Sequence, residues 1–450
     1  MNAKAFDWAG FRSGDISGVR AIEALLPDLN GCLLVKRSSA ELIEKVLKEG
    51  VLFPRSIYAC DLLGEGIWSA ETLARGGEAD SACLPITTTF GPLPWDPAVV
   101  QVLVDIVLDD GKPDPVSPRA FVADAHAKLL SLGIRPVVAI ELEFYILDGK
   151  ALKESRVAPP PCENGRGLTF DQQTLSLDRE REHRGILEAL TSACRSQGLS
   201  AEGAVIEYGP GQLEINLRHT ADVLAAADEA VLFKRTVREV ASRLGVEATF
   251  MPKPYGEFAG SGLHIHMSLL DAKTGANLAE ASIDPVLKPA IAGLVGTMSD
   301  FMAFFAPHAN SYRRIAGSYL GAMTANWGFN HRGVSVRVPK SDAKNMRLEH
   351  RIAGAEANVY LVLGAALAGV YEGIKNNMPL IASVNDEEAS GNRVPTGWIE
   401  ALDVFEKSEV VRAHVSDVLR ETFLAIKRSE IAKYNAVIPP TELTWMTRRF

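Results

Sequence analysis

The sequence predicts an α+β fold, and two features of the chain indicate it. Segments with the period-two alternation of strands are interleaved with long helical segments, and they lack the regular strand–helix–strand order of a doubly wound sheet. A length of 450 residues also predicts two or three domains. The Pro-rich stretch 111–118 is the best linker candidate, so we expect a small domain over residues 1–112 and a larger one over residues 113–450.

The elements of the first domain are expected to be short. A strand leaves the turn at Asn30 and Gly31, a helix ends at Gly50, and brief strand and loop segments continue to Trp95. In the second domain, helical patterns lie at 119–132, 178–198, 220–244, 284–305, 355–376 and 408–428. Strand patterns lie at 135–147, 203–208, 212–218, 246–251, 262–270, 333–338 and 346–353. Residues 149–175, with three consecutive prolines, are expected to form a mobile loop.

The composition is that of an ordinary globular protein. A net charge of −9 argues against a nucleic-acid partner but leaves an anionic substrate open, since a bound divalent cation reverses the local charge. Scattered cysteines without C-x-x-C spacing predict reduced thiols. The N-terminus lacks a signal-peptide core, and the apolar segment 361–370 is too short to span a bilayer, so we expect a cytoplasmic protein with no membrane partner.

The stretch from Gly260 to Ser268, G-S-G-L-H-I-H-M-S, carries the first chemical motif. Its alternation predicts a strand with His264, His266 and Ser268 on one face. The glycines before it would let the backbone approach a ligand closely. Two imidazoles beside a hydroxyl indicate a polar, chemical face, although a strand with hydrogen-bonded core histidines is an alternative.

Four glutamates occur in two further strand patterns. Glu141 and Glu143 are two residues apart in an apolar strand, so both carboxylates face the same way, which is unfavourable unless a cation lies between them. A Gly-Pro-Gly turn separates Glu207 from Glu214, and a hairpin there would bring these carboxylates together. A solvent-facing edge and an ordinary surface hairpin are the alternatives.

Arginines accompany the last strand patterns. One alternating strand places Glu349 and Arg351 on the same face, Arg332 and Arg337 lie near the ends of another, and Arg314 precedes it. Arginine forks suit phosphate and carboxylate oxygens, although each arginine alone is compatible with an ordinary surface position. Carboxylates with one histidine suit Mg²⁺ or Mn²⁺, and such ions together with arginines make a phosphoryl-transfer centre. The sequence has no P-loop and no kinase signature.

The order of these motifs resembles one family, the glutamine synthetases, and within it the γ-glutamyl-amine ligases. The resemblance rests on E-L-E, E-x-G-P-G-Q-x-E, G-S-G-x-H-x-H-x-S, N-S-Y-x-R, N-x-R-x-x-x-x-R-x-P and R-x-E-x-R, and covers residues from about 119 to 376. It implies a β-grasp-like N-terminal domain followed by a catalytic domain with a curved antiparallel sheet and helices. It also implies a homo-oligomer of stacked rings, a dodecamer, with active sites between adjacent subunits.

The resemblance implies roughly two to three Mg²⁺ or Mn²⁺ ions in each site. The ligands of the ion near the substrate glutamate would be Glu143, Glu207 and Glu214. The ligands of the ion on the ATP phosphates would be Glu141, His264 and Glu349. The residues along ATP would be His266, Ser268, Arg332 and Arg337, with Arg332 also stabilising the transferring γ-phosphoryl group. The residues that bind L-glutamate would be Gly260, Arg314 and Arg351.

The departures from the family pattern concern the amine. Ammonia-using members carry V-P-G-Y-E where residues 316–320 read A-G-S-Y-L, so Leu320 replaces a carboxylate. Trp327 resembles the W-G of relatives that use polyamines or alkylamines, and an apolar pocket lined by Leu320 and Trp327 would suit an alkyl amine better than ammonium. Ala259 stands where the family has asparagine. The resemblance implies that Asp61 corresponds to the aspartate that positions ammonium, which makes it a candidate catalytic residue, although the motif around it differs from that of the family.

The sequence therefore predicts an ATP-dependent ligase that joins the γ-carboxylate of glutamate to a primary amine through a γ-glutamyl phosphate. Such an enzyme would open a route to polyamines or small alkylamines as nitrogen sources. A glutamine synthetase that uses ammonia is the first alternative. A catalytically inactive structural or regulatory relative is the second.

Overall fold

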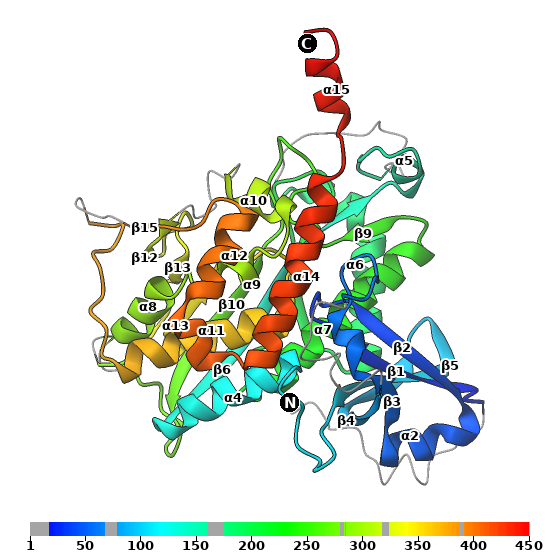
Figure 1. Ribbon diagram of the computed structural model, residues 1–450, viewed down its shortest axis with the longest axis horizontal. Helices are drawn as coiled ribbons and strands as arrows, with labels where there is room; N and C mark the ends of the chain where they lie inside the picture. Colours follow the sequence, from blue (N-terminus) through cyan, green and yellow to red (C-terminus); the bar gives the residue numbers. More distant parts are fainter. Residues whose placement is uncertain are drawn as a thin grey trace.

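The structure is a computed structural model, and it describes residues 18–67, 79–160, 174–279, 283, 285–316, 324–386 and 391–449. The first part of the chain forms a five-stranded sheet, drawn in blue to cyan in Figure 1, with the order β2-β1-β5-β4-β3. Its strands are β1 (Ala21–Pro27), β2 (Leu33–Ser39), β3 (Val51–Pro54), β4 (Asp80–Leu93) and β5 (Asp96–Ile106). Between them lie η1 (Ala40–Leu42), α2 (Ile43–Glu49) and η2 (Arg55–Ala59). The strands β1 and β5 are parallel, whereas the other neighbours are antiparallel.

The prediction of only short strands before Trp95 is wrong, because β4 has 14 residues and pairs with the 11-residue β5. Prolines and a glycine interrupt the pattern of β4 and made it look like a series of short segments. The pairing accommodates them by register shifts between Ile86 and Gly91 and between Pro92 and Leu93.

The second sheet has the order β12-β13-β14-β10-β6-β8-β7, and β9 also pairs with β6. Its strands are β6 (Ile134–Leu147), β7 (Ala201–Ile206), β8 (Gln212–Leu217), β9 (Glu247–Thr249), β10 (Leu263–Asp271), β12 (Trp327–Phe329), β13 (Val336–Val338) and β14 (Leu348–His350). Neighbours in this sheet are antiparallel except β12 and β13. The short strands β11 (Thr324–Ala325) and β15 (Asn392–Arg393) pair separately.

The structure also contains α-helices. They are α4 (Pro118–Ser131), α5 (Gly149–Lys153), α6 (Leu177–Gln197), α7 (Val223–Arg243), α8 (Leu287–Gly296), α9 (Met302–Phe305), α10 (Ala309–Ala316), α11 (Val359–Lys375), α12 (Trp398–Lys407), α13 (Glu409–His414), α14 (Asp417–Asn435) and α15 (Pro440–Met446). The almost wholly buried α11 packs against α4 and α8, and α7 packs against α6 and β6. In Figure 1, α14 runs along the front of the molecule and α15 projects away from it.

Local sequence signals explain where several helices begin. The side chain of Ser117 accepts hydrogen bonds from the first turn of α4, where Pro118 occupies the first position. Asp222 and Asn358 cap α7 and α11 in the same way. The predicted single helices at 284–305 and 408–428 are each divided in two, and Ser416 caps α14 after the second break. The helix α12 was not predicted.

The predicted α+β class is confirmed by the two sheets and their helices. Buried residues of both sheets belong to one contiguous hydrophobic core, so the division at residue 112 stays a prediction. The linker candidate folds back on the first sheet, because the amide of Asp114 donates to the carbonyl of Ile106 at the end of β5 at 3.0 Å. The carboxylate of Asp114 also forms an ion pair with Arg55 of η2 at 2.6 Å. Of the expected loop 149–175, residues 149–153 form α5, whereas 161–173 lie outside the described residues.

Candidate active site

The strand β6 presents two carboxylates on one face. Its even-numbered residues from Ile134 to Phe144 are buried, while Glu141 and Glu143 face the other side and are half-buried. This is the period-two pattern that the sequence predicts. The carboxylate face of β6 is therefore available for chemistry, because the opposite face is committed to the core.

Strand register aligns the other motifs with these glutamates. Glu141 lies directly opposite His264 on β10, and Glu143 lies opposite Glu214 on β8. On the far side of β10, His266 lies opposite Glu349 on β14. Carboxylates and imidazoles from four neighbouring strands thus form one row across the sheet, which we call the carboxylate row. Its members are Glu141, Glu143, Glu214, His264, His266 and Glu349.

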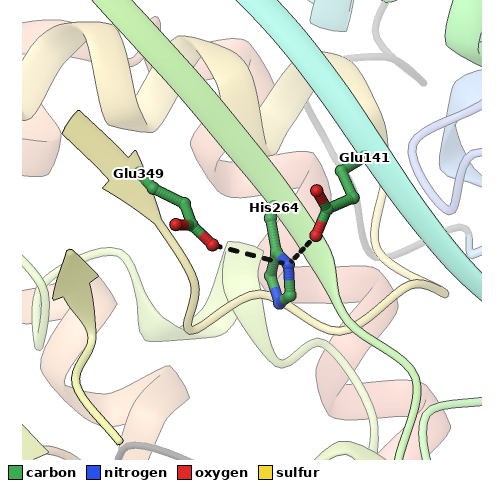
Figure 2. Close-up of side chains that lie close together, drawn as sticks. All are labelled: Glu141, His264 and Glu349. Carbon is green, nitrogen blue, oxygen red and sulfur yellow. Dashed lines mark hydrogen bonds and ion pairs between the residues drawn. The ribbon is translucent and has the colours of Figure 1, made fainter. Parts of the chain in front are cut away.

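His264 lies at the centre of this row, between the side chains of Glu141 and Glu349 (Figure 2). Its Nδ1 is 2.6 Å from Oε1 of Glu141 and 3.9 Å from Oε1 of Glu349, and its Nε2 is 3.8 Å from Oε1 of Glu143. The neighbouring His266 places its Nε2 3.3 Å from Oε2 of Glu141. Each imidazole therefore contacts the central carboxylate of Glu141.

Two groups of side chains in the described chain have the spacing to hold a cation. Glu141, His264 and Glu349 offer ligand atoms within 4.8 Å of one another, and Glu141, Glu143 and Glu214 do the same. The first group is the set expected for the ion on the phosphates. The second contains Glu141 where the resemblance implied Glu207. Glu207 lines one cavity together with Glu141, Glu143 and Glu214. Carboxylate oxygens with one imidazole suit Mg²⁺ or Mn²⁺, so the residues fit such ions.

The charges of this row are unbalanced without a cation. Burial, and then repulsion from Glu143 and Glu141, raises the pKa of Glu207 to about 7. Burial, and then repulsion from Glu141, Glu143 and Glu207, raises the pKa of Glu214 to about 9. Burial alone would also raise the pKa of Glu141, but hydrogen bonds with the two histidines hold it well below its ordinary value. A divalent cation would relieve the repulsion at Glu207 and Glu214.

Arginines close one end of the row. Nη1 of Arg337 lies 2.8 Å from Oε2 of Glu349, and Nη1 of Arg351 contacts the other oxygen of that carboxylate. The buried Nε groups of Arg337 and Arg351 have no hydrogen-bond partner among the described residues. Arg332 lines the same cavity and lowers the pKa of Glu207 against the stronger effects that raise it. Two unused guanidinium donors beside a cation site are suited to bind a phosphate or carboxylate.

The glycine-rich segment before β10 brings Arg314 to this site. A Cβ atom on Gly262 would lie 2.6 Å from Nε2 of His264 and 2.8 Å from Nη2 of Arg314. A Cβ atom on Gly260 would lie 2.6 Å from Cγ of Arg314 and would overlap the carbonyl oxygen of Pro252. Arg314 itself donates to the carbonyls of Ile352 and Arg351, at 2.8 and 3.2 Å. The glycines therefore permit the backbone of this segment to lie against the side chain of Arg314, which a Cβ atom would prevent.

Two adjoining cavities flank the row. One, of about 280 Å³, is lined by the carboxylates together with Gly260, Arg314 and Arg332. The other, of about 750 Å³, is lined by His266, Ser268 and Lys344. Glu141, His266 and Arg337 line both. Of the residues expected along the nucleotide, His266, Ser268 and Arg337 line the larger cavity, whereas Arg332 lines the smaller one. Ser268 donates to the Met346 carbonyl at 3.1 Å.

Two of the predicted residues, Trp327 and Asp61, do not line either of these cavities. The indole of Trp327 is buried, donates to the Ile381 carbonyl at 2.8 Å and packs edge-on against Phe329. The carboxylate of Asp61 accepts hydrogen bonds from its own loop and pairs with Lys433, beside a different cavity of about 980 Å³. Leu320 lies outside the described residues. The substrate roles of these residues stay predictions.

Gln212 was part of a predicted motif but was given no role. Its side-chain amide donates to the Gly260 carbonyl at 3.1 Å and to Oε2 of Glu143 at 3.4 Å. The alternation along β8 puts Gln212 on the same face as Glu214, and this was the signal that could have identified it.

The fold and the carboxylate row define the class of protein. A profile of the glutamine synthetase catalytic domain matches residues 115–446, so the chain belongs to the glutamine synthetase family. A solved GmaS/ADP complex, at 24% identity, has the same fold, with a TM-score of 0.82 over 96% of this chain and 97% of that one. Within the part of the chain that is described, no helix is long and apolar enough to cross a membrane.

Two curated relatives are glutamate–amine ligases by name. The γ-glutamylputrescine synthetase PuuA of Escherichia coli K12 is 37% identical over 95% of this chain and 91% of its own length. A glutamate–isopropylamine ligase of a Pseudomonas species is 30% identical over 92% of both chains. The predicted membership of the family, and the resemblance to its γ-glutamyl-amine ligases, are confirmed.

Proposed function

We propose that the chain is an ATP-dependent ligase that joins the γ-carboxylate of L-glutamate to a primary amine, either a polyamine or a small alkylamine. The observation that carries the proposal is the carboxylate row between two cavities, with unused arginine donors at one end. The names of the two curated relatives support the choice of an amine as the second substrate. A cytoplasmic location remains a prediction.

The reaction has two chemical steps. A γ-carboxylate oxygen of glutamate attacks the γ-phosphorus of ATP, and ADP leaves. The amine nitrogen then attacks the acyl carbon of the γ-glutamyl phosphate, expels phosphate and loses a proton. Activation is needed because a carboxylate oxygen is a very poor leaving group, whereas phosphate is a good one. Roughly two to three divalent ions, when bound to the carboxylate row, would neutralise the phosphate oxygens.

The chain's own side chains would bind and orient the two substrates. We assign ATP to the larger cavity, beside His266 and Ser268, and glutamate to the smaller one, beside Gly260 and Arg314. Arg337 then lies where the two cavities meet, and Arg351 lies beside the smaller one. Donors already held in place by Glu349 stabilise developing negative charge without reorganising during the reaction.

A panel of amines tests the proposal. ADP release would be measured with glutamate and ATP in the presence of ammonium, methylamine, isopropylamine, putrescine or spermidine. We expect an organic amine to give the highest kcat/KM, and a Glu207→Ala variant to lose at least about 100-fold in activity. Ammonium as the best substrate would leave glutamine synthesis as the function. Absence of turnover with every amine would favour an inactive relative.

A further inference from the structure

Tyr145 lies on the same face of β6 as Glu141 and Glu143, because it continues their period of two. Its side chain is fully buried, and its neighbours across the sheet are Gln212 on β8 and Thr249 on β9. The carboxylate row and Tyr145 are therefore parts of one continuous surface of the sheet.

The hydroxyl of Tyr145 has a specific partner. It donates a hydrogen bond of 2.6 Å to the carbonyl oxygen of Ala259, the residue before Gly260. The length and the partner of this bond distinguish it from an incidental contact of a core aromatic ring.

The ring of Tyr145 also fixes the turn between β7 and β8. A Cβ atom on Gly209 would overlap the Tyr145 hydroxyl, so the turn can lie this close only with glycine there. The same turn is held by Gln212, whose side-chain oxygen accepts from the Gly209 amide at 2.9 Å. Tyr145 thus contacts both segments that flank the smaller cavity, namely the turn that follows Glu207 and the glycine-rich segment.

Side chains of the sheet hold the glycine-rich segment at successive points. Oε2 of Glu143 accepts from the Gly262 amide at 2.8 Å, Gln212 donates to the Gly260 carbonyl, and Tyr145 donates to the Ala259 carbonyl. On its other side, Gly260 packs directly against the side chain of Arg314. A displacement of the peptide between Ala259 and Gly260 would therefore be transmitted to Arg314.

We propose that Tyr145 is a positioning residue for glutamate, which acts by fixing the Ala259–Gly260 peptide against Arg314. The identity of the ligand rests on the proposed function, whereas the fixing of the peptide does not. Tyr145 contacts no reacting atom in this assignment. Its loss is expected to weaken glutamate binding and to leave the chemical step largely intact.

A matched control residue lies in the same aromatic cluster. Tyr255 packs against Tyr145 with ring centroids 5.4 Å apart, and against Phe258 at 5.5 Å. Its hydroxyl is buried but has no hydrogen-bond partner among the described residues. Replacing either tyrosine by phenylalanine removes one buried hydroxyl and keeps the ring, so only the hydrogen bond to Ala259 differs.

Steady-state kinetics of Tyr145→Phe and Tyr255→Phe test the inference. In Tyr145→Phe the KM for glutamate is expected to rise about tenfold, with the KM for ATP and kcat changed less than about twofold. In Tyr255→Phe all three are expected to stay at the wild-type value. An unchanged KM for glutamate in Tyr145→Phe, or an equal rise in Tyr255→Phe, would overturn the positioning role.

Hydrogen exchange on the substrate-free protein separates this inference from the proposed function. Amides in residues 252–262 and 207–212 are expected to exchange faster in Tyr145→Phe and not in Tyr255→Phe. Unchanged exchange in Tyr145→Phe would overturn the inference whatever the enzyme's substrate. Absence of turnover in the wild-type chain would instead contradict the proposed function, and the exchange measurement would still test the contact.

Discussion

The pKa of Glu214 is raised further than that of Glu207 by burial and by the neighbouring carboxylates. In the folded chain its pKa is raised to about 9 from an ordinary value of 4.5, and that of Glu207 is raised to about 7. The folded state therefore holds these protons more tightly than the unfolded state does. Stability from this source is present at low pH and is lost as the pH rises from about 4.5 towards 9.

This loss of stability with rising pH can be tested in the presence of a chelator. Without divalent cations, raising the pH from 5 to 8 is expected to lower the free energy of unfolding of the wild type by about 1–2 kcal/mol more than that of Glu214→Gln. Chemical denaturation in EDTA at both pH values measures the difference. Mg²⁺ should remove most of it, because the ion takes the place of the lost protons. Equal pH dependence in the two proteins would contradict the electrostatic description of the row.

At the scale of elements, the approach of the glycine-rich segment to Arg314 makes a second prediction. Gly262→Ala would place a methyl group 2.6 Å from His264 and 2.8 Å from Arg314, so at least a 100-fold loss of kcat/KM is expected, on the order of 3 kcal/mol. Gly256→Ala is the control, because a Cβ there meets nothing within 4 Å. Far-ultraviolet circular dichroism would establish that both variants fold. Near-normal activity in Gly262→Ala would contradict the requirement for glycine at this position.

The sequence predicted the faces of these strands but could not predict their register. Alternation along one strand is local, so the shared face of Glu141 and Glu143 could be predicted from a few residues. The pairing of His264 with Glu141 and of Glu143 with Glu214 depends on contacts between distant segments, and a shift by one residue would reverse every face. The expectation that these residues share one site came from the family resemblance and not from a physical argument.

The direction of the Trp327 side chain could be predicted neither from the residue pattern nor from the family resemblance. Its neighbourhood in the sequence indicated an amine pocket, yet its indole hydrogen bonds to Ile381 on a segment more than fifty residues away. The direction of a side chain at the edge of a sheet is decided by what packs over it. In the same way, the lengths of β4 and β5 depended on bulges that no local pattern indicates.

At the scale of the whole molecule, Asp61 and the carboxylate row, which the resemblance assigns to one active site, lie at different cavities of the chain. The carboxylate of Asp61 is enclosed by Lys433 and by amides of its own loop, beside a cavity other than that of the carboxylate row. If Asp61 handles the amine, as the resemblance implies, it acts at the site of a neighbouring subunit. The assembly would then be part of the catalytic site and not only a form of packing.

The segment around α15 would offer a surface for such an assembly. This helix projects from the body of the molecule in Figure 1, and Val437, Ile438, Leu443, Trp445 and Met446 are each at least 51% exposed. Large apolar side chains gathered on one projecting segment are unusual for a monomer. A second copy of the chain is the partner that the stacked rings implied by the family resemblance would supply, through a contact repeated by symmetry.

Removal of residues 436–450 tests this assignment. The truncated protein is expected to have the mass of a single ring, because burial of these apolar side chains would no longer join one ring to another. Light scattering coupled to size-exclusion chromatography measures the mass directly. Ile399→Ser changes a side chain of similar exposure, 55%, on α12 and is expected to leave the mass unchanged. If the truncated and full-length chains have the same number of subunits, α15 does not hold the assembly together, and the contact between rings must come from the body of the subunit.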